Sequence, residues 1–281
     1  MTNKPLHHKT RPFGVLVFLC VLLIASPTLA EDLVFVGTVE VRETAVLSAG
    51  TDGQLTEILF QGGELVSEGQ ALMRQDTRTL DIDVQMAEAQ LKAADAQLAA
   101  AQQRASRLIT LSERKVASNA SLDDATALLA AAEAGRMIAV AQLNRAELEL
   151  DKATIRAPIA GIISRPSAAL GAFLEAEAGP PLARIVQLDP VLVAYKVPYE
   201  TRLATLRATG ATTLEDLFPK LSLTVTLQSG ETVASGLRPE FAGATVEEAS
   251  GALTVFTLVP NPERTLRPGM TVTVTADLQQ D

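Results

Sequence analysis

The sequence predicts an elongated α+β protein of several modules. An antiparallel α-helical coiled-coil hairpin is inserted in a split, small β-sandwich, and a small antiparallel β-barrel and a further β domain follow. Three observations carry this prediction: two alanine- and leucine-rich runs with a 3.5-residue repeat, a pair of similar glycine-containing segments on either side of them, and alternating apolar and polar residues in the last third of the chain.

The helical hairpin is expected over residues 77–153. Counting three and four residues alternately places apolar side chains at a and d positions over residues 80–108 and again over residues 122–153, which is the coiled-coil pattern. Only Arg136 interrupts the second run, and a lone polar residue in such a seam can fix the register. The segment holds no proline, and alanine and leucine are strong helix formers.

A polar break at residues 112–121 separates the two runs. A short break between two helical runs predicts an antiparallel hairpin, with the turn near Ser118 and Asn119. Each arm is then about 50 Å long at 1.5 Å per residue. Because nearly half of the seam positions are alanine, the two helices are expected to approach closely.

Two similar half-motifs flank the expected hairpin. The stretch Ala49-Gly-Thr-Asp-Gly53 precedes it, and the stretch Ala157-Pro-Ile-Ala-Gly161 follows it. In each copy a further glycine and then Leu-x-Arg follow, at Gly63 and at Gly171 respectively. Short apolar runs with glycine turns predict a small sandwich built from two halves, at residues 45–76 and 154–188.

The last third of the chain reads as β structure. Strand-like runs lie in residues 191–197, 221–227, 232–237, 253–259 and 270–278, and a short helix is expected after Pro198. We expect a β-barrel over residues 189–244. A separate β domain is expected from residues 31–44 and 245–281, because the strand-like segment near the start could pair with the last strands.

Composition excludes several function classes. The formal net charge is −9, which argues against a nucleic-acid surface because such a surface needs clustered basic charge. The only cysteine, Cys20, and both histidines lie within the first 30 residues. Without that segment the chain has no thiol, imidazole or tryptophan, so disulfides and chemistry that needs a histidine base or cysteine nucleophile are excluded. No metal cluster or phosphate-binding loop is found, and the sequence predicts a protein that is not an enzyme and needs no cofactor.

The first 30 residues have the layout of a signal peptide. Basic residues precede an apolar run over residues 13–25, and Thr28 and Ala30 supply small residues at −3 and −1 of a cleavage site after Ala30. An uncleaved inner-membrane anchor is the alternative, although the apolar run is shorter than the roughly 20 residues of a membrane span. A lipid attachment at Cys20 is disfavoured because Leu19 stands where a small residue is needed. Export is predicted in every case.

The stretches Gly63–Asp76 and Thr154–Gly161 resemble the split biotinyl-lipoyl-like domain of periplasmic adaptor proteins, the membrane fusion proteins of the HlyD-like family. Simple biotinyl or lipoyl carriers share this small fold, but they need an acceptor lysine on an exposed turn. No lysine occurs in residues 45–76 or 153–195. The carrier function is therefore not expected.

The C-terminal third resembles adaptors of RND-type efflux pumps. The resemblance rests on Ser250-Gly251, Val259-Pro-Asn-Pro262 and Leu266-Arg-Pro-Gly-Met270, together with Gly37-Thr-Val-Glu40 near the start. It implies that the second β domain is membrane-proximal. It also implies a protein of the periplasm, associated with the inner membrane, that bridges an inner-membrane RND transporter and a TolC-like outer-membrane channel for multidrug efflux of small molecules. Several copies, hexameric in the usual picture, would pack into a tube.

Two other functions stay open at this point. An adaptor of an ABC exporter or type I secretion system would share the lipoyl-like halves, but the Pro-Asn-Pro and Pro-Gly-Met segments argue against it. A structural coiled-coil protein of the envelope would explain the helices alone, but not the repeated half-motifs that flank them.

The resemblance also points to candidate contact residues at the hairpin tip. Arg107, Leu111 and Ser118 match the motif that adaptors of this family use to contact the outer-membrane channel. In the seam count Arg107 is a c position and Leu111 a g position, so both lie off the central seam. From the repeat alone Leu111 could widen the core, Arg107 could be a solvated charge and Ser118 could cap the second helix. The match to the motif favours channel contact.

Overall fold

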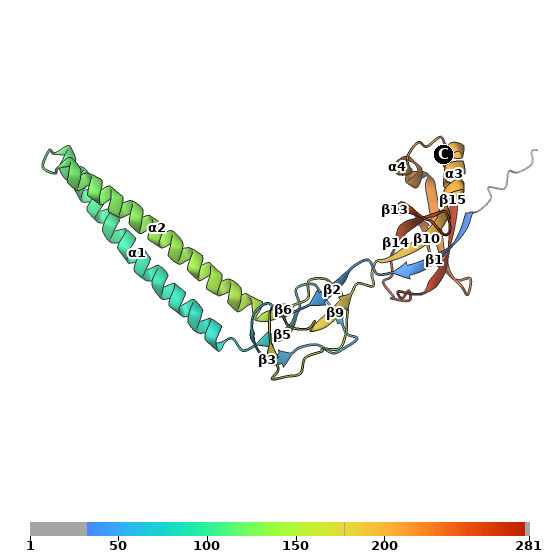
Figure 1. Cartoon of the computed structure of the whole chain (residues 1–281), viewed down its shortest axis with the longest axis horizontal. Helices are drawn as coiled ribbons and strands as arrows, with labels where there is room; N and C mark the ends of the chain where they lie inside the picture. Colours follow the sequence, from blue (N-terminus) through green and yellow to red (C-terminus); the bar gives the residue numbers. More distant parts are fainter. Residues whose placement is uncertain (1–32, 177, 279–281) are drawn as a thin grey trace, which may run out of the picture.

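The computed structural model describes residues 33–176 and 178–278. The predicted signal peptide, with Ala30, lies outside the described residues. Three parts follow one another along the long axis of the molecule: two long helices at one end, a small β module in the middle and a larger sheet at the other end (Figure 1). The chain runs outward through the β modules, turns at the far end of the helices and returns through the same modules.

The two long helices are α1 (Arg78–Glu113) and α2 (Asn119–Lys152), and they run antiparallel side by side (Figure 1). The face predicted as the seam is the face turned to the partner helix. Four seam alanines are buried, namely Ala87, Ala105, Ala125 and Ala139, and the other apolar seam positions in the two helices are buried or half-buried. With alanine at the buried contacts, the two backbones can lie close together and the pair is thin.

Arg136 is the exposed member of the predicted seam. Its Nε donates a hydrogen bond to Asp95 Oδ1 of α1 at 2.7 Å, so it joins the two helices from the edge of the contact. Both side chains are almost half exposed, and exposed ion pairs of this kind contribute about 0–1 kcal/mol. The pair therefore favours one register more than it adds stability.

Among the described residues, α2 alone has the length and apolar composition of a membrane-crossing helix. Its many alanines account for this composition. Because its seam face lies against α1, we interpret α2 as one arm of the helical pair.

The middle module consists of two four-stranded sheets, in the orders β2-β9-β7-β4 and β6-β5-β3-β8. The strands before the helices are β2 (Thr44–Leu47), β3 (Gly53–Ile58), β4 (Leu65–Val66) and β5 (Ala71–Gln75). The strands after them are β6 (Thr154–Arg156), β7 (Gly161–Ile163), β8 (Phe173–Leu174) and β9 (Ala183–Val186). Each sheet mixes both halves, so neither half can form its core alone.

Backbone conformation and close backbone packing explain why glycine occurs at the repeated positions of the half-motifs. Gly63 and Gly171 both have left-handed φ angles, 88° and 83°, which glycine adopts without the steric penalty of a side chain. Gly161 has a different reason, because a Cβ atom there would lie 2.4 Å from the carbonyl oxygen of Val186. The repeat therefore marks equivalent turns around one shared core, whose largest fully buried side chains include Leu55, Leu72, Met73, Ile163 and Ile185.

The helices leave and re-enter this module at one point. Strands β5 and β6 are hydrogen-bonded neighbours, with Arg74 opposite Thr154, so the chain ends of α1 and α2 lie together. The amide of Gln75 donates to the carbonyl of Ala153 at 3.0 Å, and Asp76 accepts from the amide and the guanidinium of Arg78. The root of the hairpin is thus tied to the sheet by both strands.

The remaining strands form one seven-stranded sheet in the order β12-β11-β15-β1-β10-β14-β13. They are β1 (Leu33–Glu40), β10 (Val191–Pro198), β11 (Leu221–Leu227), β12 (Thr232–Leu237), β13 (Pro239–Glu247), β14 (Ala252–Val259) and β15 (Thr271–Leu278). Helices α3 (Tyr199–Thr209) and α4 (Leu214–Leu217) and a 3₁₀ turn (Phe218–Lys220) lie at the end remote from α1 and α2 (Figure 1).

This sheet corrects one prediction. The sequence assigned residues 31–44 and 245–281 to a membrane-proximal domain separate from a barrel over residues 189–244. Strand β1 instead pairs with β10 on one side, with Gly37 opposite Tyr195, and with β15 on the other, with Phe35 opposite Val274. The prediction of two modules is wrong here because the first and last strands are central members of the barrel sheet and share its single core.

The Pro-Asn-Pro motif marks the junction between the two β modules. Asn261 is buried, and its side-chain amide donates to the carbonyls of Leu188 (2.8 Å) and Leu266 (2.9 Å). The side-chain oxygen of Asn261 accepts a hydrogen bond from the backbone N–H of Leu266, and the backbone N–H of Asn261 donates one to Asp189 Oδ1. One side chain therefore holds the segment that enters the barrel to the loop that precedes the last strand.

Candidate functional site

The tip of the helical pair is built by a tight turn over residues 114–118. The amide of Val116 donates to the carbonyl of Leu111 at 2.9 Å, and the amide of Lys115 donates to the carbonyl of Ser112 at 2.8 Å. This is the Schellman arrangement that closes a helix C-terminus. Lys115 occupies its left-handed position, with φ 57°, where glycine is the usual residue. The turn lies slightly before the predicted position, because Ser118 already belongs to the start of α2.

Ser118 is the N-cap of α2. Its hydroxyl oxygen accepts a hydrogen bond from the amide of Ser121 at 3.2 Å, and the two hydroxyl oxygens are 2.8 Å apart. Of the interpretations open for this residue, helix capping is therefore observed. Its hydroxyl nevertheless lies at the exposed end of the hairpin, where a second protein can reach it.

Arg107 and Leu111 lie one helical turn apart near the end of α1. Both are exposed, Leu111 to 39%. Within the described residues no carboxylate lies within 4 Å of the Arg107 guanidinium. Leu111 thus keeps part of its apolar surface open to a partner, and Arg107 forms no ion pair with another described residue. An exposed leucine beside an unpaired guanidinium can bury apolar area and donate a forked hydrogen bond to a partner.

Sequence reasoning missed two neighbours of these residues. Val116 is 73% exposed at the tip, and Ile109 is 45% exposed on the last turns of α1. The repeat could not identify Val116, because it lies in the polar break outside both helical counts. An apolar residue inside an otherwise polar turn was the available signal.

The tip also concentrates positive charge in an acidic chain. Residues 104–118 contain the cations Arg104, Arg107, Arg114 and Lys115 and a single carboxylate, Glu113, and Asp123 and Asp124 follow on the first turns of α2. The end of the hairpin is therefore slightly basic, whereas the whole chain carries a net charge of −9. Exposed apolar side chains and unpaired cations together define a surface suited to a partner with apolar and acidic groups.

Outside the tip, chemistry would be indicated by metal-binding clusters or by shifted pKa values among the described residues. No group of three or more histidine, cysteine, aspartate or glutamate residues that could hold a metal occurs within residues 33–176 and 178–278. The pKa of Asp76 is lowered to about 2, first by the side-chain hydrogen bond from Arg78, and this carboxylate sits at the hairpin root. Burial in the barrel raises the pKa of Tyr195. The shifts at Asp76 and Tyr195 are thus explained by a local ion pair and by burial.

A long helical pair inserted in a sandwich, followed by an open barrel, defines the architecture of a membrane fusion protein. Two family models match nearly all of the described chain. One, described as the barrel-sandwich hybrid domain of RND MFPs, matches residues 43–186, and the other, described as their beta-barrel domain, matches residues 190–280. The chain belongs to the family of RND membrane fusion proteins.

Named relatives support this placement. The chain is 25% identical over 235 residues to the multidrug resistance protein MdtE of Escherichia coli K12, which covers 84% of this chain and 61% of MdtE. It is 31% identical over 256 residues to the efflux pump periplasmic linker BepF of Brucella suis, which covers 91% of this chain and 61% of BepF. The chain thus spans about three fifths of the length of these relatives.

Solved structures show the same fold at low sequence identity. The membrane fusion protein Spr0693 from Streptococcus pneumoniae R6 matches with a TM-score of 0.61 and 18% identity, over 88% of this chain and 100% of that one. A MacA–MexA chimeric protein that contains the Pseudomonas aeruginosa MexA α-hairpin domain matches with a TM-score of 0.56 and 20% identity, over 89% of this chain and 82% of that one.

Proposed function

We propose that this protein is the periplasmic adaptor of a tripartite RND efflux system. It would join an inner-membrane RND transporter to a TolC-like outer-membrane channel and so allow small molecules to be exported across both membranes. The observation that carries this proposal is the separation of two exposed ends. The basic and apolar hairpin tip lies at one end of an elongated molecule, and the helix-covered end of the barrel lies at the other (Figure 1).

In this proposal α1 and α2 act as a coiled-coil strut. The alternating three- and four-residue spacing of the less exposed positions supports coiled-coil packing, and the buried alanines allow a close approach. The shared sandwich core and the paired strands β5 and β6 hold the root of the strut.

The two ends would have different partners. Arg107, Leu111 and Ser118 would contact the outer-membrane channel, and the barrel would sit on the transporter at the periplasmic face of the inner membrane. Several copies, six in the arrangement expected for the family, would surround a common passage. The protein would act without catalysis or a cofactor, with the transporter supplying the energy. An ABC or type I secretion partner, or a purely structural role, is less well supported because both matched domain families are of RND type.

The proposal is tested by efflux from a strain that lacks the chromosomal gene and carries the Arg107→Asp, Leu111→Asp double variant. Reversing the charge and placing a carboxylate at the apolar contact is expected to abolish drug efflux. The variant should keep wild-type far-UV circular dichroism, because neither side chain lies in the seam.

The matched control introduces the same two aspartates near the C-terminal end of α2, at an exposed arginine and an exposed leucine, in the double variant Arg145→Asp, Leu148→Asp. It should retain most of the efflux. Wild-type efflux from the tip variant would remove Arg107 and Leu111 from the functional surface, and equal loss in both variants would show that any acidic substitution on the arms is harmful.

A further inference from the structure

The two flanks of the helical pair differ in charge. With Ala105 and Leu122 counted as a positions, the e and b positions of α1 and α2 lie on one flank, and the g and c positions lie on the other. The e and b positions hold eight acidic and two basic residues, a net charge of −6, and we call this side the acidic flank. The g and c positions hold three acidic and four basic residues, a net charge of +1, and form the basic flank.

The basic flank is also the hollowed one. A groove of about 400 Å³ runs along it between side chains of residues 97–104 and 128–132. A second groove of about 340 Å³ lies closer to the sandwich, between side chains of residues 80–90 and 142–149. Between the two grooves lies Gly135, a g position, where an added Cβ atom would meet nothing within 4 Å. This flank therefore has room for side chains of another helix.

Apolar side chains are exposed at the same height on both flanks. Met137 lies at a b position of the acidic flank and is 65% exposed. Ile138, the next residue, lies at a c position of the basic flank and is 61% exposed. Ile109 adds a third exposed apolar side chain on the acidic flank, nearer the tip. Packing of one flank against the other would bury all three.

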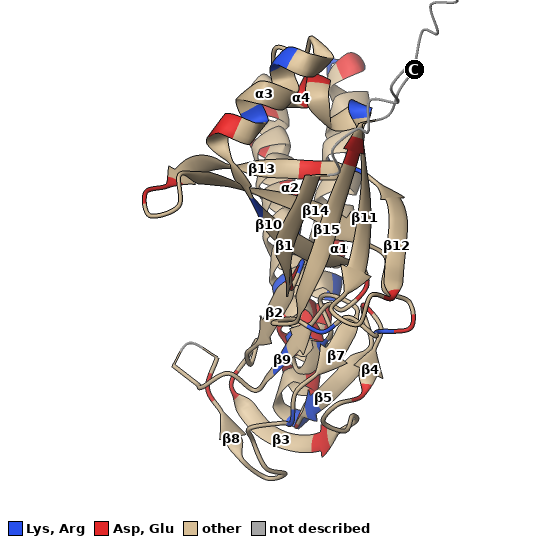
Figure 2. Ribbon diagram, turned by 90° about the vertical axis from the view of Figure 1, so that its right-hand side faces the viewer, with Lys and Arg blue, Asp and Glu red and all other residues tan. Residues whose placement is uncertain are grey.

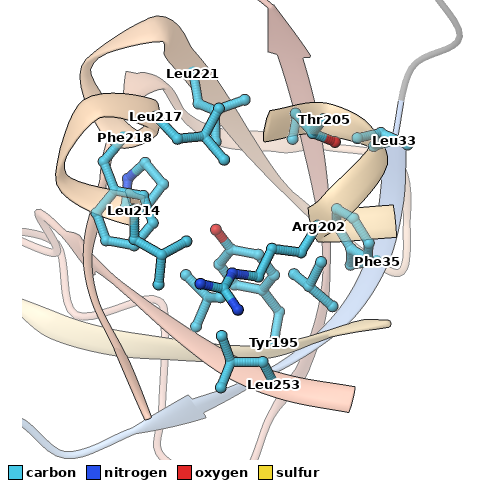
Figure 3. A pocket seen from close by; sticks show the side chains of 14 residues that line it. Leu33, Phe35, Tyr195, Arg202, Thr205, Leu214, Leu217, Phe218, Leu221 and Leu253 are labelled. Carbon is cyan, nitrogen blue, oxygen red and sulfur yellow. The ribbon is translucent and has the colours of Figure 1, made fainter. Parts of the chain in front are cut away.

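The barrel end shows no comparable division. Acidic and basic residues alternate over α3 and α4 and form no patch of one sign (Figure 2). The pocket beneath these helices, which Phe35, Tyr195 and Leu217 help to line, has a volume of about 40 Å³ and no room for a segment of another protein (Figure 3). Separated charge and open grooves thus occur together on the helical pair.

We propose that the acidic flank of one copy packs against the basic flank of the next copy, with the hairpins parallel. This inference rests on the proposed assembly of several copies, and it names the two surfaces that meet. Charge favours a second copy of this chain as the occupant, because a flank of −6 complements a flank of +1, whereas two acidic flanks would repel each other. A contact between two different surfaces leaves one flank free at each end, so it continues until the copies close a ring.

Parallel packing brings residues of the same height together. In α2, Glu147 lies on the acidic flank only two residues from Arg145 on the basic flank. The carboxylate of one copy would therefore lie level with the guanidinium of the next. Exposed ion pairs are individually weak, so one reversal such as Arg145→Asp should leave most of the contact intact.

Introduced thiols test which flanks meet. Cys20 is the only cysteine, so a Cys20→Ser background leaves no other thiol. One tagged copy carries Gln102→Cys on the acidic flank, and a second, differently tagged copy carries Gln97→Cys on the basic flank. These positions are about 7.5 Å apart along α1 at 1.5 Å per residue. Both copies are produced in cells that lack the chromosomal gene, and a short bismaleimide is added.

We expect crosslinks between the two variants and few within either one. Gln103→Cys in place of Gln102→Cys is the matched control, because its thiol faces outward at an f position; its crosslinking to Gln97→Cys should be several-fold weaker. Crosslinks mainly within one variant would show that like flanks meet, and the inference would be wrong. A lack of crosslinks between the variants in cells with normal efflux would overturn it as well. Because efflux is measured in the same cells, failure of the flank contact is distinguished from failure of the proposed function.

The role of charge is tested by reversing two carboxylates of the acidic flank. Glu88→Lys with Glu133→Lys changes the charge of that flank from −6 to −2 and should lower the yield of crosslinks roughly two- to tenfold. Asp83→Lys is the matched control on the basic flank and should not lower the yield. Equal yields from the double variant and the control would contradict the pairing of opposite charges.

Discussion

At the scale of single residues, the tip combines a strained backbone with an exposed surface. Lys115 holds a left-handed conformation that costs a residue with a side chain about 1 kcal/mol or more. The turn is fixed by the two hydrogen bonds to the carbonyls of Leu111 and Ser112. Lys115 keeps this conformation although it is not glycine, and its exposed side chain lies in the turn between α1 and α2, where a partner at the tip would meet it.

We expect Lys115→Gly to stabilise the tip by about 1 kcal/mol, because glycine adopts the left-handed conformation without strain. Amide hydrogen exchange in the last turn of α1 should slow about fivefold. Arg114→Gly is the control: φ at Arg114 is −81°, so glycine relieves nothing there and should speed exchange. Faster exchange in Lys115→Gly would show that the turn differs from the one described.

Asn261 gives a second prediction at this scale. Asn261→Ala leaves three buried backbone groups of Leu188 and Leu266 without their partner, and should destabilise the barrel by about 3 kcal/mol. Urea unfolding followed by tyrosine fluorescence measures this, because both tyrosines lie in or next to the barrel. Asn144→Ala, at an exposed site on α2, should leave the same transition unchanged. An equally small effect of both substitutions would mean that Asn261 does not hold the junction.

At the scale of elements, the helical pair was the most predictable part. The sequence shows which residues of each helix face the other helix, because alanine and leucine recur with one spacing over many turns. The least exposed residues of both helices are mostly those that this spacing selects. The turn was placed slightly late, since a serine-rich stretch indicates a break without showing which serine caps the next helix. The exposure of Val116 and the conformation of Lys115 depend on the closed turn, so spacing alone could not supply them.

Close packing of the two arms can be tested at Ala125, which is almost fully buried against α1. Ala125→Leu adds volume where the backbones approach and should destabilise the hairpin by about 1–3 kcal/mol. Thermal unfolding monitored by far-UV circular dichroism reports this change. Ala131→Leu, on the exposed face of the same helix, should be nearly neutral. Equal stability of the two variants would contradict the narrow seam.

At the scale of the whole molecule, the division into β modules depends on pairing between strands that are far apart in the sequence. This pairing could not be predicted from the sequence. Strand periodicity identified the β segments of the last third except β13 (Pro239–Glu247), which it missed. It also could not show that β1 lies between β10 and β15, whose residues are far away in the chain. A strand at the start of a sequence carries no mark of its neighbours, so one barrel was predicted as two modules. The two sandwich halves were recognised because glycine turns recur in both.

The result is a molecule whose two exposed ends lie far apart, joined by modules that the chain crosses twice (Figure 1). Asn261 joins segments of the chain at the junction of the two β modules, and the paired strands β5 and β6 join the outgoing and returning chain at the base of the helices. Such a connection can keep the hairpin and the barrel in a defined relation while each end contacts a different protein.

Site-specific crosslinking in intact cells tests this account most directly. A photoreactive amino acid is placed at Val116 of the tip in one strain and at Val36 on the outer face of the barrel in another, both well-exposed positions. We expect the tip probe to capture an outer-membrane channel protein and the barrel probe to capture an inner-membrane transporter or a second copy of this chain. Capture of proteins from the same membrane by both probes, in cells with active efflux, would contradict the bridging role.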